Sequence, residues 1–204
     1  MFMLKKKRMN CYVSLINLFS IENKQIEFCM KTFFSFFFCF FINSILFSQE
    51  NYPVPEKTAS RLFYIQHSNN YNTYVYDANM EGDFISTENP INEYRIVYTE
   101  DGAKKPLNKI QKQFAYGMIT KLIAPNLIEM HLAASSKLKF YLTFSDKEKP
   151  RVYVTINKCK LYLDSMFVQL KEGSTSLKTK AKYVLFSGKD FITGENVVEK
   201  LIVK

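Results

Sequence analysis

The sequence is poor in glycine and histidine, with six glycines and two histidines among 204 residues. So few glycines leave little room for a loop that cradles phosphate, and no such loop is present. The Gly-x-Ser-x-Gly elbow of hydrolases is also absent. His67 and His131 lack the His-x-His or His-Glu-x-x-His spacing of metal sites. The chain therefore carries no recognisable catalytic or metal-ligating set, and no metal or other cofactor is predicted.

Cysteine is equally scarce. Three of the four cysteines, Cys11, Cys29 and Cys39, lie in or before an apolar segment near the N-terminus, which leaves Cys159 alone in the rest of the chain. If that segment is removed, no internal disulfide can form and a zinc site of several thiolates is excluded. The core must then stabilise the fold unaided, and Cys159 is interpreted as a small apolar strand residue.

The apolar segment, residues 33–47, contains eight phenylalanines and follows a basic residue, Lys31. Its 15 residues are fewer than the roughly 20 that a membrane-spanning helix needs. A basic residue, a short apolar run and a small residue at the exit are typical of a secretory signal. We therefore predict a signal peptide over residues 30–48, cleaved between Ser48 and Gln49, and a periplasmic or extracellular location. The alternative is a retained N-terminal anchor.

The residues before this segment are unusual for a signal, because 29 of them precede Met30. We expect residues 1–29 to reflect an over-extended start. The alternative is a cytoplasmic lead, held inside by the basic residues 5–8.

The remaining 156 residues suit one domain with its own core. Without residues 1–48 the net charge is +5, and residues 137–204 hold 14 basic against 7 acidic side chains. This balance indicates an anionic envelope component as partner, such as a lipid headgroup, an acidic glycan or a protein. Nucleic acid is not expected outside the cytoplasm, and a membrane partner is expected only if the apolar segment is retained. The alternative is that the lysines only keep sheet edges solvated and prevent aggregation.

Alternating apolar residues dominate the chain after an extended lead-in over residues 49–60. The clearest case is residues 138–144, where leucine and phenylalanine alternate with lysine, tyrosine and threonine. The pattern predicts eleven short strands, over residues 61–68, 73–77, 93–98, 118–124, 127–133, 138–144, 152–156, 159–163, 166–170, 180–186 and 197–203. No alternation of strands and helices is visible. The predicted fold is mainly β, an antiparallel sandwich or barrel of about ten short strands with one amphipathic helix, in a single domain over residues 61–204.

That helix is predicted to begin at Pro106, where a missing N–H does no harm. Leu107, Ile110 and Phe114 recur at spacings of three and four, so they form an apolar stripe that is expected to lie on a sheet. Gly117 is expected to end the helix in the left-handed conformation.

Several segments resemble one uncharacterised family. They are residues 61–70, 75–79, 94–98, 110–117, 167–170 and 193–200. On these segments the chain is similar to the domain of unknown function family 4833, exported proteins of Gram-negative bacteria, over residues 53–201. One departure is Asn157-Lys158, where the family pattern is Asn-Gly, although a two-residue hairpin turn is still predicted here. The resemblance implies one exported domain and brings no activity.

The first predicted hairpin offers the best catalytic alternative. It brings His67, Asn70 and Asp77 into a short span, from which an exported hydrolase could be built. Ser68 is a poor nucleophile for His67, because neighbouring strand residues point to opposite faces. The simpler interpretation is that the asparagines form the turn and His67 is an ordinary strand residue.

A basic strand offers the best binding surface. Residues 178–182 place three lysines on one face by period two, and tyrosines are expected on neighbouring outward faces: Lys178, Lys180, Lys182, Tyr141, Tyr153 and Tyr162. Cations interleaved with tyrosine rings could bind an anionic glycan or a lipid headgroup. We favour a non-enzymatic binding domain over the hydrolase.

Overall fold

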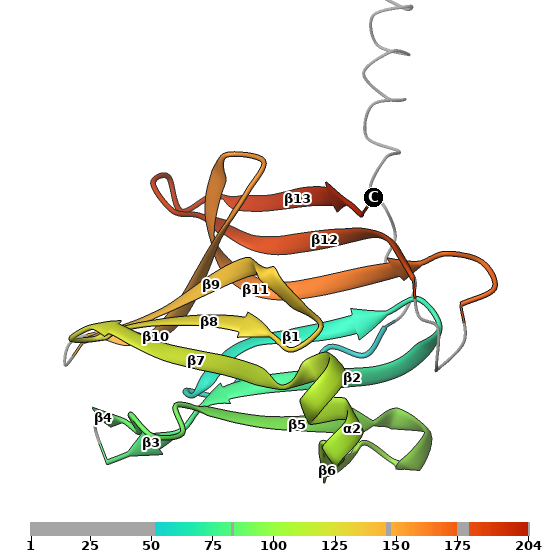
Figure 1. Cartoon of the computed structure of the whole chain (residues 1–204), viewed down its shortest axis with the longest axis horizontal. Helices are drawn as coiled ribbons and strands as arrows, with labels where there is room; N and C mark the ends of the chain where they lie inside the picture. Colours follow the sequence, from blue (N-terminus) through green and yellow to red (C-terminus); the bar gives the residue numbers. More distant parts are fainter. Residues whose placement is uncertain (1–51, 83, 146–147, 175–179, 204) are drawn as a thin grey trace, which may run out of the picture. The chain divides into compact units, whose positions relative to one another are not determined.

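The structure is a computed structural model that describes residues 52–82, 84–145, 148–174 and 180–203. The predictions for residues 1–48 lie outside these residues. Thirteen strands occur in the described part of the chain (Figure 1): β1 (Arg61–His67), β2 (Asn70–Ala78), β3 (Met80–Glu81), β4 (Phe84–Ile85), β5 (Ile91–Val97), β6 (Ala103–Pro106), β7 (Met118–Ala124), β8 (Leu127–Leu132), β9 (Ser135–Ser145), β10 (Glu148–Ile156), β11 (Cys159–Leu170), β12 (Ala181–Asp190) and β13 (Asn196–Ile202). The helical segments in the same described part are η2 (Tyr98–Glu100), α2 (Lys109–Gln111) and η3 (Lys112–Tyr116). The mainly β prediction is confirmed.

Eleven of the strands form one curled sheet, a half-barrel, that branches at β11. The first part of β11 pairs with β10, the later part pairs with β1, and the opposite edge pairs with β12. Two arms therefore diverge from β11, one ordered β1-β2-β5-β6 and the other β10-β9-β8-β7. The remaining strands, β3 and β4, pair with each other and lie outside the eleven strands predicted from the sequence.

The expectation of antiparallel pairing is wrong at one place. β1 runs parallel to β11, with Tyr64 opposite Ser165 and His67 opposite Val168. The two strands lie about a hundred residues apart in the sequence, so no hairpin turn sets their direction. β11 is also one strand where two were expected, because a register shift between Leu163 and Ser165 interrupts the alternation without ending the strand.

The core fills the space between the two arms. The Phe63 ring of β1 stacks on Tyr76 of β2 at 4.5 Å and on Phe140 of β9 at 5.7 Å, and none of the three side chains is exposed. Each such ring stabilises the fold by about 2–3 kcal/mol through burial. A hydrogen bond also links the core to η3, because the Tyr76 hydroxyl donates to the Tyr116 carbonyl oxygen at 2.7 Å. The arms are therefore joined by side chains as well as by β11.

The lead-in packs on the opposite face of the sheet. It has no helix or strand over residues 52–58, yet Pro55 is buried and the Gln66 amide donates to the Pro53 carbonyl at 2.8 Å. The Tyr52 ring lies against Phe167 and Tyr71, at 5.2 Å from each. This segment therefore covers part of β1, β2 and β11.

The predicted helix is shorter than expected, and its orientation is wrong. Leu107 is buried, but Ile110 and Phe114 are 72% and 66% exposed instead of lying on the sheet. Tyr116 makes the contact, because its ring stacks on Tyr74 at 3.5 Å. After α2 the chain continues as the π-helical turn η3, which changes the residue spacing on which the predicted stripe depended.

Gly117 does not end the helix as predicted either. Its backbone is extended, with φ −63° and ψ 142°, and is not left-handed. A Cβ at this position would lie 2.1 Å from the Lys112 carbonyl oxygen, so the glycine allows a close approach of backbone to backbone. The Asn157-Lys158 turn is confirmed, since both residues have positive φ, 49° and 73°, as a two-residue hairpin of type I′ requires.

Candidate functional site

The structure separates the three residues of the hairpin hypothesis. His67 pairs with Asn70 beside the turn, whereas Asp77 pairs with Arg61 at the other end of the hairpin. The seven residues from Arg61 to His67 span roughly 20 Å along the strand. Asp77 is therefore not placed to act with His67 and Asn70.

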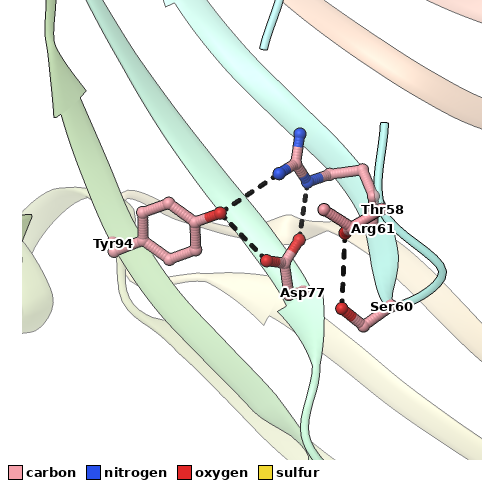
Figure 2. Close-up of polar contacts among 5 residues, drawn as sticks. All are labelled: Thr58, Ser60, Arg61, Asp77 and Tyr94. Carbon is pink, nitrogen blue, oxygen red and sulfur yellow. Dashed lines mark hydrogen bonds and ion pairs between the residues drawn. The ribbon is translucent and has the colours of Figure 1, made fainter. Parts of the chain in front are cut away.

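Asp77 instead binds a buried arginine, as Figure 2 shows. Its carboxylate accepts from Arg61 Nε at 2.6 Å and from the Tyr94 hydroxyl at 2.9 Å, and Arg61 Nη2 donates to the same hydroxyl at 3.1 Å. Only 10% of the Arg61 side chain and 12% of the Asp77 side chain are exposed. Burial and the adjacent carboxylate raise the pKa of Tyr94. This closed triangle fixes β1, β2 and β5 to one another.

His67 is a core residue. It is 7% exposed and its ring lies edge-on to Tyr74 at 5.8 Å and to Tyr116 at 5.5 Å. Within the described residues its Nε2 has no hydrogen-bond partner. Burial lowers the pKa of His67 to about 4, so the imidazole is neutral at pH 7.

Asn70 shapes the turn between β1 and β2. Its side-chain oxygen accepts from the Asn72 N–H at 2.9 Å, and its amide donates to the Asn69 side chain at 2.8 Å. Ser68 is also occupied, because its hydroxyl accepts from the Leu170 N–H at 3.0 Å. The hairpin therefore has the geometry of a structural turn.

The tyrosines that were expected on outward faces do come together. Tyr141 of β9 lies opposite Tyr153 of β10, and Tyr153 lies opposite Tyr162 of β11. These three residues form what we call the tyrosine row. Their chain neighbours Phe140, Leu142, Val152, Val154 and Leu161 are buried in the core. The row therefore occupies the outer face of the sheet, with each ring half-buried against the next.

The rings of the row contact one another and a fourth ring. Tyr141 stacks on Tyr153 at 5.1 Å, and Phe191, which follows β12, lies 4.8 Å from Tyr162 and 5.5 Å from Tyr153. Burial and the neighbouring phenols Tyr141 and Tyr162 raise the pKa of Tyr153, so its hydroxyl stays neutral at pH 7. The outer face thus presents a continuous aromatic surface across three strands.

Cations lie on and beside these rings. Lys160 Nζ is 4.0 Å from the Tyr153 centroid and 3.5 Å from that of Phe191, and the Arg151 guanidinium is 5.2 Å from Tyr162. Lys189, an exposed residue, lies opposite Tyr162 in the register of β11 and β12. Arg151, Lys160 and Phe191 were not predicted from the sequence. The period-two spacing of Arg151 to Tyr153 and of Lys160 to Tyr162 is the signal that could have indicated the first two.

Lys180 and Lys182, two of the three predicted lysines, do not lie beside Tyr141. Lys180 and Lys182 are exposed at the start of β12, and Lys178 lies outside the described residues. Lys182 is seven residues from Lys189, which meets the row, and this corresponds to roughly 24 Å along the strand. Among the described residues, the cations that lie over or opposite the rings of the row include Arg151, Lys160 and Lys189, while Lys139, two residues from Tyr141, is bound to Glu129.

A comparison with known protein families identifies the family of this chain. The sequence model of a family described as Domain of unknown function (DUF4833) matches residues 63–200. The chain belongs to this family. The match confirms the resemblance seen in the sequence, and it includes both the first hairpin and the tyrosine row of this DUF4833 domain. No curated protein and no solved structure matches the chain.

The described part of the DUF4833 domain has neither a cluster of metal-binding side chains nor a membrane-spanning helix. In the described ranges, no three His, Cys, Asp or Glu side chains lie close enough together to hold a metal ion. The helices in these same ranges include none that is long and apolar enough to cross a membrane.

Proposed function

We propose that this DUF4833 domain is an exported, non-enzymatic binding domain of the cell envelope, and that its tyrosine row contacts an acidic glycan. The observation that supports this function most directly is the outer aromatic surface with Arg151 and Lys160 against its rings. Tyrosine supplies an apolar ring for stacking and a hydroxyl for hydrogen bonding. The cations supply charge where the ligand carries carboxylates.

The spacing of the rings favours a polysaccharide. One tyrosine stands on each of three adjacent strands, so the rings repeat about every 4.8 Å and the row spans about 10 Å. This repeat is comparable to the spacing of successive sugar rings in an extended glycan. A chain that lies across the strands can therefore contact the outer edge and the hydroxyl of each tyrosine in turn, because the ring faces already lie against neighbouring rings and cations. Its carboxylates would reach Arg151, Lys160 and Lys189.

The alternative role of such a row is cross-strand packing, in which the rings only stabilise the sheet. That role accounts for the stacking of Tyr141 on Tyr153. It does not require two cations, Arg151 and Lys160, held over the ring faces. Binding and packing differ in one measurable respect, which is the response of ligand affinity to the charge at residue 160.

The apolar segment at residues 33–47 supports the export part of the proposal. The compact unit Tyr52–Lys204 begins just after the predicted cleavage between Ser48 and Gln49, so cleavage there would release the whole unit. The net charge of +5 after cleavage suits an acidic envelope partner. The hydrolase hypothesis has no comparable support, since Asp77 is bound to Arg61 and lies far from His67.

The test uses the chain from Gln49 and isothermal titration with polygalacturonate oligosaccharides, with neutral glucan oligosaccharides as the uncharged comparison. We expect binding of the acidic ligand that weakens with salt, and little binding of the neutral one. Tyr153→Ala should weaken binding by about tenfold, which corresponds to the loss of about 1.4 kcal/mol of ring and hydroxyl contacts.

Lys160→Gln should weaken binding of the acidic ligand severalfold. A matched control is Lys200→Gln, because Lys200 Nζ also lies 4.0 Å from a tyrosine centroid, that of Tyr183 on β12. We expect this control to bind like the unsubstituted domain. Equal effects of the two lysine substitutions, or unchanged affinity in Tyr153→Ala, would show that the row is only a packing feature.

A further inference from the structure

A second surface of the domain is apolar and exposed. It comprises residues from α2, η3 and β7, and we call it the apolar–basic patch. Its apolar members are Ile110 (72% exposed), Phe114 (66%), Ile119 (55%) and Ile123 (44%). Large apolar side chains that are exposed one by one are ordinary, but four within fourteen residues, with Ile119 on the same face of β7 as Lys121, indicate an interaction surface.

The strand in this patch lies at the edge of the sheet. In the described residues β7 pairs with β8 and with no other strand. Its first residue is bound, because the Met118 N–H donates to the Glu93 carboxylate. Further along, Ile119, Leu122 and Ile123 remain exposed. Proteins usually protect such an edge with charges or cover it, so a partner is expected here.

The charges around the patch are positive. Lys109, Lys112 and Lys121 are exposed and alternate in the sequence with the apolar residues. Two carboxylates lie close to these lysines. Glu93 is 3.8 Å from Lys112 Nζ, and Glu129 stands opposite Lys121 but is bound to Lys139 Nζ at 3.0 Å, so Lys109 and Lys121 supply most of the unpaired positive charge. The patch therefore combines exposed apolar side chains with positive charge. It complements a surface that has anionic groups on the outside and apolar groups beneath them.

We propose that the apolar–basic patch docks the domain on an anionic lipid membrane. Ile110 and Phe114 enter the boundary between headgroups and acyl chains, while Lys109, Lys112 and Lys121 contact anionic headgroups. This contact involves neither the tyrosine row nor a membrane-spanning helix. It differs from the expectation that a membrane partner requires retention of residues 33–47.

A protein partner suits this surface less well. The cores of protein interfaces are depleted in lysine, whereas lysines here stand beside the apolar residues, as with Lys109 next to Ile110 and Lys121 two residues from Ile119 on one face of β7. A second copy added through β7 would bring the two Lys121 side chains near each other around the two-fold axis, which is unfavourable. A lipid surface has no such conflict, since it offers negative charge opposite every lysine.

The experiment is vesicle flotation with the chain from Gln49, which contains the whole compact unit and lacks residues 33–47. Vesicles of phosphatidylcholine with 30% phosphatidylglycerol (about one anionic lipid in three) are compared with pure phosphatidylcholine. We expect binding to the anionic vesicles, with weaker binding at high salt. Ile110→Ser with Phe114→Ser should lower the partition coefficient by about tenfold or more. Lys109→Gln with Lys121→Gln should lower it by at least about tenfold, since each lysine near the surface contributes about fivefold.

The matched control is Ile192→Ser, because Ile192 is 92% exposed and lies in the turn between β12 and β13. It should bind vesicles like the unsubstituted domain, and so should Tyr153→Ala, which tests the glycan proposal separately. Unchanged binding in the Ile110/Phe114 double variant would overturn the proposal. So would a dimer, measured by sedimentation, that this double variant dissociates, because the patch would then bind a second copy.

Discussion

Neutral His67 makes the stability of this domain depend on pH. The imidazole is 7% exposed, lies edge-on to Tyr74 and Tyr116, and has an Nε2 without a hydrogen-bond partner among the described residues. Burial lowers its pKa to about 4, from 6.5 in the unfolded chain. The unfolded state therefore binds the proton more readily, and stability is lost as the pH falls from about 6.5 towards 4.

The size of this loss follows from the two pKa values. Between pH 7.5 and pH 5.0 the His67 contribution falls by about 2 kcal/mol, and by pH 4 the loss reaches about 3 kcal/mol. The assay is urea unfolding at pH 7.5 and pH 5.0. With a slope near 2 kcal/mol per M, the midpoint should fall by about 1 M through this residue alone.

His67→Phe is the comparison, because it keeps an aromatic ring between Tyr74 and Tyr116 but cannot titrate. Other groups with altered pKa values, such as buried Glu93, titrate in both proteins and cancel in the difference. The unsubstituted domain should lose about 2 kcal/mol more than the variant between the two pH values. Parallel losses, in this variant and in His67→Asn, would refute the assignment of a buried neutral histidine.

Three further substitutions test the fold. Gly117→Ala should destabilise the domain by about 1–3 kcal/mol in urea unfolding, because its methyl group would meet the Lys112 carbonyl oxygen, and an unchanged midpoint would contradict the close approach. Asp77→Ala should lower stability by about 3–5 kcal/mol, since it leaves Arg61 buried without its ion pair, and a loss under 1 kcal/mol would show that the triangle is solvated. Lys158→Gly should raise the melting temperature by a few degrees, because glycine adopts φ 73° without strain, whereas a lower temperature would contradict the type I′ turn.

Local patterns predicted much of the fold. The alternation over residues 138–144 placed Phe140 and Leu142 in the core, and both are fully buried. The turn at Asn157-Lys158 also followed from the short span between two alternating segments. These features depend on neighbours in the sequence, so the sequence pattern contains them.

Long-range features could not be predicted in the same way. Nothing in the alternation of β1 or β11 specifies that the two strands pair, or that they run parallel. The exposed positions of Ile110 and Phe114 depend on the π-helical turn and on the stacking of Tyr116 against Tyr74. Neither the π-helical turn nor this stacking can be predicted from a regular helical period.

The candidate site was predicted only in part, because it too depends on long-range contacts. Outward tyrosines follow from alternation, but their assembly into a row depends on the registers of β9, β10 and β11. The positions of Lys160 over two rings and of Phe191 beside them depend on β12 and the turn after it. The lysines at residues 178–182 were chosen by charge and period alone, which do not show how far a strand end lies from Tyr141.

The most direct test of glycan binding by the tyrosine row is to map ligand contacts by NMR. The chain from Gln49 is titrated with an acidic oligosaccharide while backbone amide and tyrosine ring signals are followed. We expect the largest chemical-shift changes at four residues of this surface, Tyr141, Tyr153, Tyr162 and Lys160. The signals of residues around His67 should not change. Shifts centred on the first hairpin, or none at the tyrosine row under conditions where the ligand binds, would contradict this expectation.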